Sequence, residues 1–240
     1  MPRLALIGGT SFLDTEPPVG SVPHEVETDR GAVTVHERDG VVVLQRHGFA
    51  EYRTAARIDH ARNIRALAEL GCERILAVAS VGGLRPEVAV GSFVCPDDFI
   101  ALHLGLSMSE GHGGERVPGF DPDLRAEVIA TWGRLAEPPL IDGGVYWQAI
   151  GPRFETAAEI RLIAAHADVI GMTAAAECIL AGELGIPYAV VCVVDNLANG
   201  VGEGPLSVAE FEAGKERNRG LAIASVKAVA AGLANSGHAA

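Results

Sequence analysis

Apolar residues along the chain fall into two alternating patterns. Short runs rich in branched side chains, such as residues 4–7 and 75–80, predict buried strands. Between such runs, apolar residues recur at helical spacing, most regularly over 55–70, and Gly71 stands where that helix is expected to end. This alternation predicts an α/β fold, and the length of 240 residues favours a single domain covering 1–240.

Turn and capping residues mark further elements. Asp39 and Gly40 separate two β-branched runs and predict a hairpin. Pro122 is typical of the first turn of a helix, and Thr156 with Glu159 has the spacing of a capping box. The other predicted elements are hairpin strands over 33–36 and 41–45, a strand over 146–150, a strand pair over 93–102, a mobile surface loop over 105–120 and a helix over 208–233. The strand over 75–80 is expected to end at Gly82 and Gly83.

The stretch from 146 to 199 is the most informative part of the chain. Its last strand, over 188–194, is apolar on both faces and delivers Asp195 and Asn196 at its carboxyl end. In α/β folds this is the edge of the sheet where ligands bind, although Asx residues also begin simple turns. A buried acid at this place needs a partner, because an unpaired one is unfavourable by several kcal/mol. We therefore expect the chemistry of the protein to lie here.

Two polar groups follow other predicted strands. Glycines 8 and 9 precede Thr10, an arrangement that lets backbone N–H groups approach an anion, although such a turn is also common without a ligand. It lacks the lysine of a P-loop and the third glycine of a dinucleotide-binding turn. Arg46 and His47 end the predicted hairpin, where they fit either a dianion site or a solvated turn.

Charge and cysteine content exclude several classes of protein. A formal net charge of −12 argues against nucleic acid as a partner, whereas a small anion remains compatible with a few converging cations. Cysteines 72, 95, 178 and 192 are isolated in sequence and the histidines share no spacing, so no metal site or disulfide is predicted. The first apolar run is too short for a membrane span. We expect a soluble, cytoplasmic protein with reduced thiols.

Five motifs occur in a recognisable order. They are IGGTSFLD, RHG followed by NIRAL, SVGGLRPE with GSFVCPDDFI, GPRFETAAE, and ADVIGMTAAAECILAGELGI. Over residues 3 to about 212 the chain resembles the 5′-methylthioadenosine phosphorylase branch of the trimeric purine nucleoside phosphorylase family. The resemblance implies a single-domain purine nucleoside phosphorylase-like fold, with a central mixed β-sheet flanked by helices, and a homotrimer. It also implies phosphorolysis of a purine nucleoside to free purine and a sugar 1-phosphate, without a cofactor and with inorganic phosphate as co-substrate.

The resemblance also assigns roles to individual positions. Those matching the family's phosphate contacts are Thr10, Arg46, His47, Ser80 and Thr173. Those matching its nucleoside contacts are Val81, Gly82, Phe154, Glu155, Met172 (under the ribose), Asn196 and Ala198. Asn196 and His47 are the residues expected to take part in catalysis.

The predicted choice of base depends on Asn196. Adenosine-type members of the family usually carry Asp there and a second Asp two residues later, where this chain has Ala198. An ionised Asp only accepts hydrogen bonds, whereas an amide can accept from purine N7–H and donate to a 6-oxo oxygen. Glu155 can accept from the N1–H of an oxopurine. This favours a 6-oxopurine nucleoside, namely inosine, guanosine or S-methyl-5′-thioinosine; the alternatives are a 5′-methylthioadenosine phosphorylase, a nucleoside hydrolase and a non-catalytic binding protein.

Two departures from the family pattern leave the 5′ substituent open. Glu51 stands where many relatives carry a second histidine, and the glycine-rich segment 103–119, which in such trimers reaches the neighbour's sugar pocket, is short. Leu206, Val208 and Phe211 would suit an apolar cleft for a 5′-methylthio group.

Overall fold

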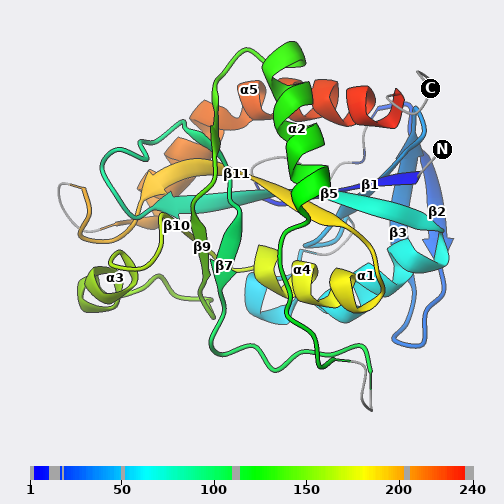
Figure 1. Ribbon diagram of the computed structural model, residues 1–240, viewed down its shortest axis with the longest axis horizontal. Helices are drawn as coiled ribbons and strands as arrows, with labels where there is room; N and C mark the ends of the chain where they lie inside the picture. The colour runs from blue at the N-terminus through cyan, green and yellow to red at the C-terminus, as the bar shows by residue number, and fades with distance from the viewer. Residues whose placement is uncertain are drawn as a thin grey trace.

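Helices cover both faces of one large mixed sheet in the computed structural model (Figure 1). The structure describes residues 3–10, 17, 19–49, 52–109, 114–202 and 206–235. Its strands are β1 (Arg3–Gly8), β2 (Val22–Val26), β3 (Val33–Arg38), β4 (Val41–Gln45), β5 (Cys72–Gly83), β6 (Phe93–Cys95), β7 (Asp98–Ile100), β8 (Leu140–Asp142), β9 (Val145–Gln148), β10 (Val169–Gly171) and β11 (Tyr188–Leu197). Its α-helices are α1 (His60–Glu69), α2 (Pro122–Leu135), α3 (Ala157–Ile163), α4 (Ala174–Glu183) and α5 (Val208–Asn235).

The centre of the sheet is parallel and its flanks are mixed. Strands β4, β1, β5 and β11 run parallel to one another in this order, so their carboxyl ends meet at one edge. Antiparallel pairs join β3 to β4, β10 to β5 and β6 to β11. The ladder between β5 and β11 contains a bulge, because Val194 pairs with Val81 and Asn196 with Gly82, which leaves Asp195 as the extra residue. The predicted mixed sheet is confirmed.

Neighbouring residues of the central strands supply two separate cores. Ile75 of β5 packs in the core that includes residues of α1 and α4, whereas Leu76 packs in the core that includes residues of α2 and α5. These two pairs of helices lie on opposite sides of the sheet (Figure 1). The side chains of Leu67 on α1 and Trp132 on α2 are buried in these two cores. Because helices cover both faces, the central strands are apolar at nearly every position, as their sequences predicted.

The local turn and capping signals are confirmed. Asp39 and Gly40 both have positive φ, at 51° and 77°, as the tight hairpin between β3 and β4 requires. The helix that was predicted to open at Pro122 does so. Thr156 and Glu159 make both hydrogen bonds of a capping box at the start of α3.

Three predicted elements differ in the structure. Residues 55–70 do not form one helix: Ala55–Arg57 is a 3₁₀ turn, and α1 begins at His60 because the Asp59 carboxylate accepts from the backbone N–H of Arg62. Strand β5 does not end before its glycines but continues through Gly83, since β10 and β11 pair with it there.

The third difference concerns residues 93–102. They form β6 and β7 as separate strands that do not pair with each other, because β6 pairs with β11 and β8 whereas β7 pairs with β9. The predicted loop 105–120 contains no helix or strand in its described residues 105–109 and 114–120. Its last residue, Phe120, is buried against the ring of Tyr188. Strands β2, β8 and β10 were not predicted.

Candidate active site

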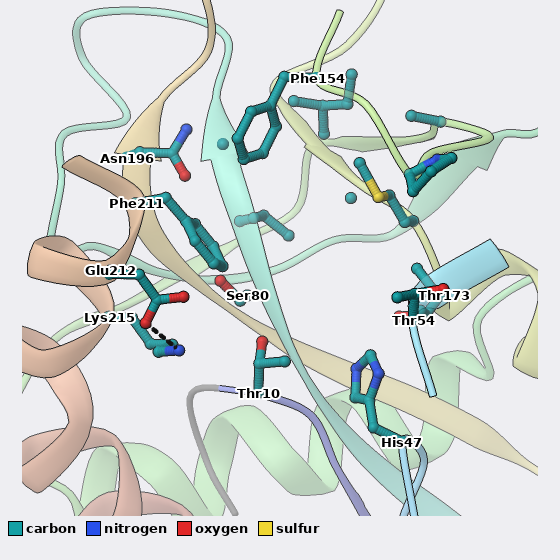
Figure 2. Close-up of a pocket in the computed structure, with 18 of the residues that line it drawn as sticks. Thr10, His47, Thr54, Ser80, Phe154, Thr173, Asn196, Phe211, Glu212 and Lys215 are labelled. Atoms are coloured by element: carbon teal, nitrogen blue, oxygen red, sulfur yellow. Dashed lines mark ion pairs between the residues drawn. The ribbon is translucent and has the colours of Figure 1, made fainter. Parts of the chain in front are cut away.

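A cavity of about 530 Å³ lies where the parallel strands end. Its lining comes from the carboxyl ends of β4, β5 and β11, from Thr10 just after β1, from the start of α4, and from α5 (Figure 2). This is the place at which α/β folds bind ligands. All twelve predicted site residues line it: Thr10, Arg46, His47, Ser80, Val81, Gly82, Phe154, Glu155, Met172, Thr173, Asn196 and Ala198.

A buried ion pair lies next to the cavity, just after the end of β4. The guanidinium of Arg46 donates from Nε to Glu177 Oε1 at 2.7 Å and from Nη2 to Oε2 at 3.0 Å. Its Nη1 donates to the carbonyl of Val78 at 2.7 Å. The two charged side chains are 2% and 1% exposed, so the alternative of a solvated turn at Arg46 is wrong. Arg46 is itself one of the residues that line the cavity.

Glu177 sets the charge of this region. Burial acts to raise the pKa of its carboxyl, but Arg46 and His60 more than offset this and bring the pKa down to about 2. The hydroxyl of Tyr188 donates to Oε2 at 2.7 Å. Glu177 is therefore ionised, and it neutralises Arg46, which offers N–H donors but little net charge to a ligand. Sequence reasoning missed Glu177, although an acid in the otherwise apolar run MTAAAECIL was a signal.

The glycine turn after β1 serves this ion pair. A Cβ on Gly9 would clash with Nη1 of Arg46, so a larger residue here would displace the guanidinium. The packing of Arg46 therefore gives a second reason for glycine at this position, besides the predicted approach of an anion to the backbone. Residues 11–16, which complete the motif, lie outside the described part of the chain.

His47 is held as a neutral ring. Its Nδ1 lies 2.7 Å from the carbonyl of Arg53, and because a carbonyl only accepts, this nitrogen carries the proton. Burial and the neighbouring Arg46 lower the pKa of His47 to about 4. The ring stacks on Tyr52 with centroids 4.9 Å apart. At neutral pH Nε2 is therefore unprotonated and can accept a hydrogen bond from a ligand.

Thr10 and Thr173 line the cavity on the side where His47 lies (Figure 2). Thr173 is the N-cap residue of α4, yet its side chain does not cap the helix. The backbone N–H groups of Thr173 and Ala174 donate instead to the hydroxyl of Tyr146. The positive end of the α4 dipole and the hydroxyls of Thr10 and Thr173 together suit an anion.

Ser80 is hydrogen-bonded to Asp195, the buried acid near the carboxyl end of β11. Its hydroxyl donates to Asp195 Oδ2, and Asn218 Nδ2 of α5 donates to Oδ1 at 2.9 Å. Asp195 is 1% exposed, so the predicted need of this acid for partners is confirmed. Because Ser80 gives its proton to Asp195, it can accept from a ligand but cannot donate to it.

The opposite end of the cavity carries the residues predicted for the base. Asn196 donates from Nδ2 to the carbonyl of Leu197 at 2.9 Å, which leaves its second N–H and its Oδ1 for a ligand. The side chain is near Phe154 at this end (Figure 2), and Phe154 lies 5.9 Å from Phe211 between ring centroids. Burial raises the pKa of Glu155, whose carboxyl is partly enclosed.

Several lining residues were not predicted from the sequence. Tyr52 and Thr54 come from the segment after β4, and Glu212 and Lys215 come from α5. Of the three residues suggested for an apolar 5′ cleft, Leu206 and Phe211 line the cavity. Val208 is not part of the lining and is 67% exposed, so that part of the suggestion is wrong. Glu51 lies outside the described residues.

Comparison with known proteins identifies the family. The model of the phosphorylase superfamily matches residues 3–231, so the chain belongs to that superfamily. A probable 6-oxopurine nucleoside phosphorylase of Archaeoglobus fulgidus is 37% identical over 221 residues, covering 90% of this chain and 91% of that protein. A probable S-methyl-5′-thioinosine phosphorylase of Xanthomonas campestris is 34% identical over 83% of this chain and 85% of its own length. These relatives confirm the predicted family and nucleoside phosphorylase class.

A solved structure supports the same fold. The methylthioadenosine phosphorylase of Schistosoma mansoni in complex with adenine superposes with a TM-score of 0.80 at 22% identity. The match covers 96% of this chain and 90% of that one. The predicted fold class is thereby confirmed.

Other expectations concern metals, thiols and membranes. Among the described residues, no group of three His, Cys, Asp or Glu side chains is arranged to hold a metal ion. The four cysteines are free and buried, and burial raises the pKa of Cys72 and Cys95 to about 11. In the part of the chain that the structure describes, no helix is both long and apolar enough to cross a bilayer.

Proposed function

We propose that the chain catalyses phosphorolysis of a 6-oxopurine nucleoside, with inosine, guanosine and S-methyl-5′-thioinosine as the candidate substrates. The products are the free purine and ribose 1-phosphate or its 5-methylthio analogue. The observation that carries the proposal is the neutral amide of Asn196 at one end of a cavity whose other end gathers Thr10, His47 and Thr173.

The reaction needs two different environments in one pocket. As the C1′–N9 bond breaks, its electron pair goes to the purine while positive charge develops on the ribose, and an oxygen of phosphate forms the new bond to C1′. Asn196 can accept from N7–H and donate to the 6-oxo oxygen of the leaving base. The hydroxyls of Thr10 and Thr173 can hold phosphate on the other side of the sugar.

The buried ion pair gives phosphate an additional role. Because Glu177 already neutralises Arg46, the charge of bound phosphate is not cancelled by the protein. The remaining negative charge can therefore stabilise the developing cation on the ribose. Neutral His47 can accept a hydrogen bond from a phosphate hydroxyl through Nε2, which would orient the nucleophile.

The relatives support the oxopurine assignment over its alternatives. Both curated relatives described above carry names of enzymes that act on 6-oxopurine or thioinosine nucleosides. A 5′-methylthioadenosine phosphorylase remains the first alternative because structural neighbours have that activity, and a nucleoside hydrolase remains the second. A non-catalytic binding protein is disfavoured because all predicted site positions line one cavity.

A panel of nucleosides tests this function. Inosine, guanosine, adenosine, methylthioadenosine and methylthioinosine are each supplied with and without phosphate, and purine release is measured. We expect purine release only from the 6-oxopurine nucleosides, and only when phosphate is supplied. Release at full rate in phosphate-free buffer would favour the hydrolase, and faster turnover of the 6-aminopurine nucleosides would contradict the role of Asn196.

We further propose a cytoplasmic homotrimer that uses no metal or organic cofactor. Four free, buried thiols are typical of reducing compartments. Leu102 and Val117, which are 84% and 92% exposed, lie in or beside the segment expected to reach a neighbouring subunit. The reaction involves no net oxidation or reduction, because phosphate is the nucleophile and the purine is the leaving group. Light scattering should give three times the chain mass of 25.0 kDa, and a monomer would contradict the trimer.

A further inference from the structure

A second ion pair lines the cavity and has no role in the reaction described so far. Lys215 Nζ lies 2.5 Å from Glu212 Oε2, three residues earlier on α5 (Figure 2). The side chain of Lys215 is 21% exposed and that of Glu212 is 54% exposed. The ammonium also lies 5.5 Å from the centre of the Phe211 ring. Water or a ligand can reach both charges.

The position of this pair is fixed by contacts between α5 and β11. A Cβ on Gly214 would clash with the carbonyl of Asp195, so the helix backbone touches the end of the strand. One turn later, Asn218 Nδ2 donates to Val194 O at 3.0 Å and to Asp195 Oδ1 at 2.9 Å. Lys215 follows Gly214 directly in the chain. The pair is therefore held beside the cavity before any substrate arrives.

We give the name α5 wall to four lining residues of the cavity: Phe211, Glu212 and Lys215 of α5, together with Tyr52 from the segment after β4. At one end, Tyr52 stacks on His47 beside the proposed phosphate site. At the other end, Phe211 contacts Phe154 beside the proposed base site. The α5 wall thus extends from the phosphate end to the base end of the cavity, and it faces the sugar that must lie between them.

The stereochemistry of a nucleoside directs its 5′ group toward this wall. In a β-nucleoside the 5′-carbon lies on the same face of the ribose as the base, and phosphate attacks from the opposite face. The 5′ substituent therefore lies toward the base side of the sugar, where Phe211 and Glu212 come from α5. Asn196 and Phe154, which we propose to contact the base, are drawn at the same end of the cavity as Phe211 (Figure 2).

A hydroxyl and a methylthio group differ sharply in such a place. A hydroxyl can donate to the Glu212 carboxylate and accept from the Lys215 ammonium at the same time. A methylthio group would displace water from both charges without replacing its hydrogen bonds, which is unfavourable. Leu206 and Phe211 supply apolar surface nearby, but they do not cover the ion pair.

We propose that the Glu212–Lys215 pair recognises a free 5′-hydroxyl, so that ordinary 6-oxopurine nucleosides are preferred over their 5′-methylthio analogues. This inference rests on the proposed phosphorylase function. It assigns a specificity-determining role to two residues of α5 and replaces the wholly apolar 5′ cleft that the sequence suggested.

The test compares two substrates across three proteins. The quantity is the ratio of kcat/KM for inosine to that for S-methyl-5′-thioinosine at saturating phosphate, in the wild type, Lys215→Met and the control Arg219→Met. Arg219 lies one turn further along α5 in a similar pair with Glu216 and does not line the cavity. We expect the wild type to favour inosine, Lys215→Met to lower the ratio by about tenfold, and the control to leave it unchanged.

The variant Glu212→Gln and the KM for phosphate provide two further checks. Glu212→Gln keeps the size of the side chain and should also lower the ratio, while melting temperatures report whether each variant is folded. A wild type that favours the methylthio substrate, or a ratio unchanged in both variants, would overturn the inference. So would a rise in the KM for phosphate with the ratio unchanged, because Lys215 would then serve phosphate. If the wild type releases no purine from any nucleoside with phosphate, the proposed function itself is wrong.

Discussion

Two ion pairs of opposite character contribute residues to the cavity. Arg46 and Glu177 share two hydrogen bonds, are almost fully buried, and come from positions 131 residues apart in the chain. Lys215 and Glu212 share one contact, are partly exposed, and lie one helical turn apart. The comparison shows that burial decides what an ion pair can do. A buried pair stabilises the fold around the pocket, whereas a solvent-exposed pair can exchange its partner for a ligand.

The energetics of the two pairs follow from their burial. Removing one partner of a buried pair leaves an uncompensated charge, which costs about 3–5 kcal/mol. An exposed pair on a helix contributes only about 0.3–0.5 kcal/mol. Phosphate therefore cannot readily draw Arg46 away from Glu177, whereas a sugar hydroxyl can displace the weak contact between Lys215 and Glu212.

Glu177→Ala should have the largest effect. The change leaves the guanidinium of Arg46 and the hydroxyl of Tyr188 buried without their acceptor, and it should lower the free energy of unfolding by about 3–5 kcal/mol in urea titrations. The double variant Arg46→Met with Glu177→Leu should recover much of this loss, because no charge is then left alone. A loss below about 1 kcal/mol in the single variant would show that the pair is not a structural element.

The next effect is a pH dependence caused by His47. Its pKa is about 4 in the folded protein against 6.5 in the unfolded chain, so the unfolded chain binds more protons between these values. Stability should therefore fall as the pH is lowered, by about 2 kcal/mol between pH 7 and pH 5. Urea titrations at the two pH values measure this.

His47→Gln provides the comparison for that effect. Glutamine can still donate to the carbonyl of Arg53 but cannot take up a proton, so the loss between pH 7 and pH 5 should shrink. His166→Gln removes an exposed histidine outside the cavity and should retain the wild-type dependence. Equal curves for both variants would mean that His47 is not held neutral.

Asn196→Asp should change the choice of base by about tenfold or more. A carboxylate can only accept hydrogen bonds, so it opposes a 6-oxo oxygen and suits a 6-amino group. The ratio of kcat/KM for inosine to that for adenosine measures the change. Asn235→Asp adds the same charge at the exposed end of α5 and should leave the ratio unaltered. An unchanged ratio in Asn196→Asp would mean that this residue does not contact the base.

The smallest expected effect is that of Glu212→Ala on folding. Because the pair with Lys215 is partly solvated and local, the free energy of unfolding should change by less than about 1 kcal/mol. Urea titration of this variant beside Glu177→Ala compares the two pairs directly. A loss above about 2 kcal/mol would remove the distinction between them.

Signals confined to a few neighbouring residues were predicted well from the sequence. The hairpin at Asp39 and Gly40 and the capping box of Thr156 and Glu159 depend on contacts within four residues, so their chemistry is legible without the fold. The central strands were also predictable, because burial on both faces makes every position apolar. Strand β2 was missed because its residues are largely exposed and include Pro23, which hides any alternation.

The residues that line the site were predicted from the sequence, but the hydrogen bonds and ion pairs between them were not. The motif resemblance named twelve residues that line the cavity, but no pattern in the sequence joins Arg46 to Glu177 or Ser80 to Asp195. These bonds depend on how β4, β5, α4 and β11 are brought together. Lys215 escaped notice because the Ala-rich helical pattern does not say which turn of α5 faces a ligand.

The bulge in β11 separates two neighbouring residues by task. Asp195, the inserted residue, is bound to Ser80 and Asn218, while Asn196 lines the cavity and keeps free hydrogen-bonding capacity. A single codon at position 196 can thus be altered with the anchor at 195 untouched. Base preference in this scaffold can evolve, or be engineered, without a penalty to the framework that holds the last strand against its helix.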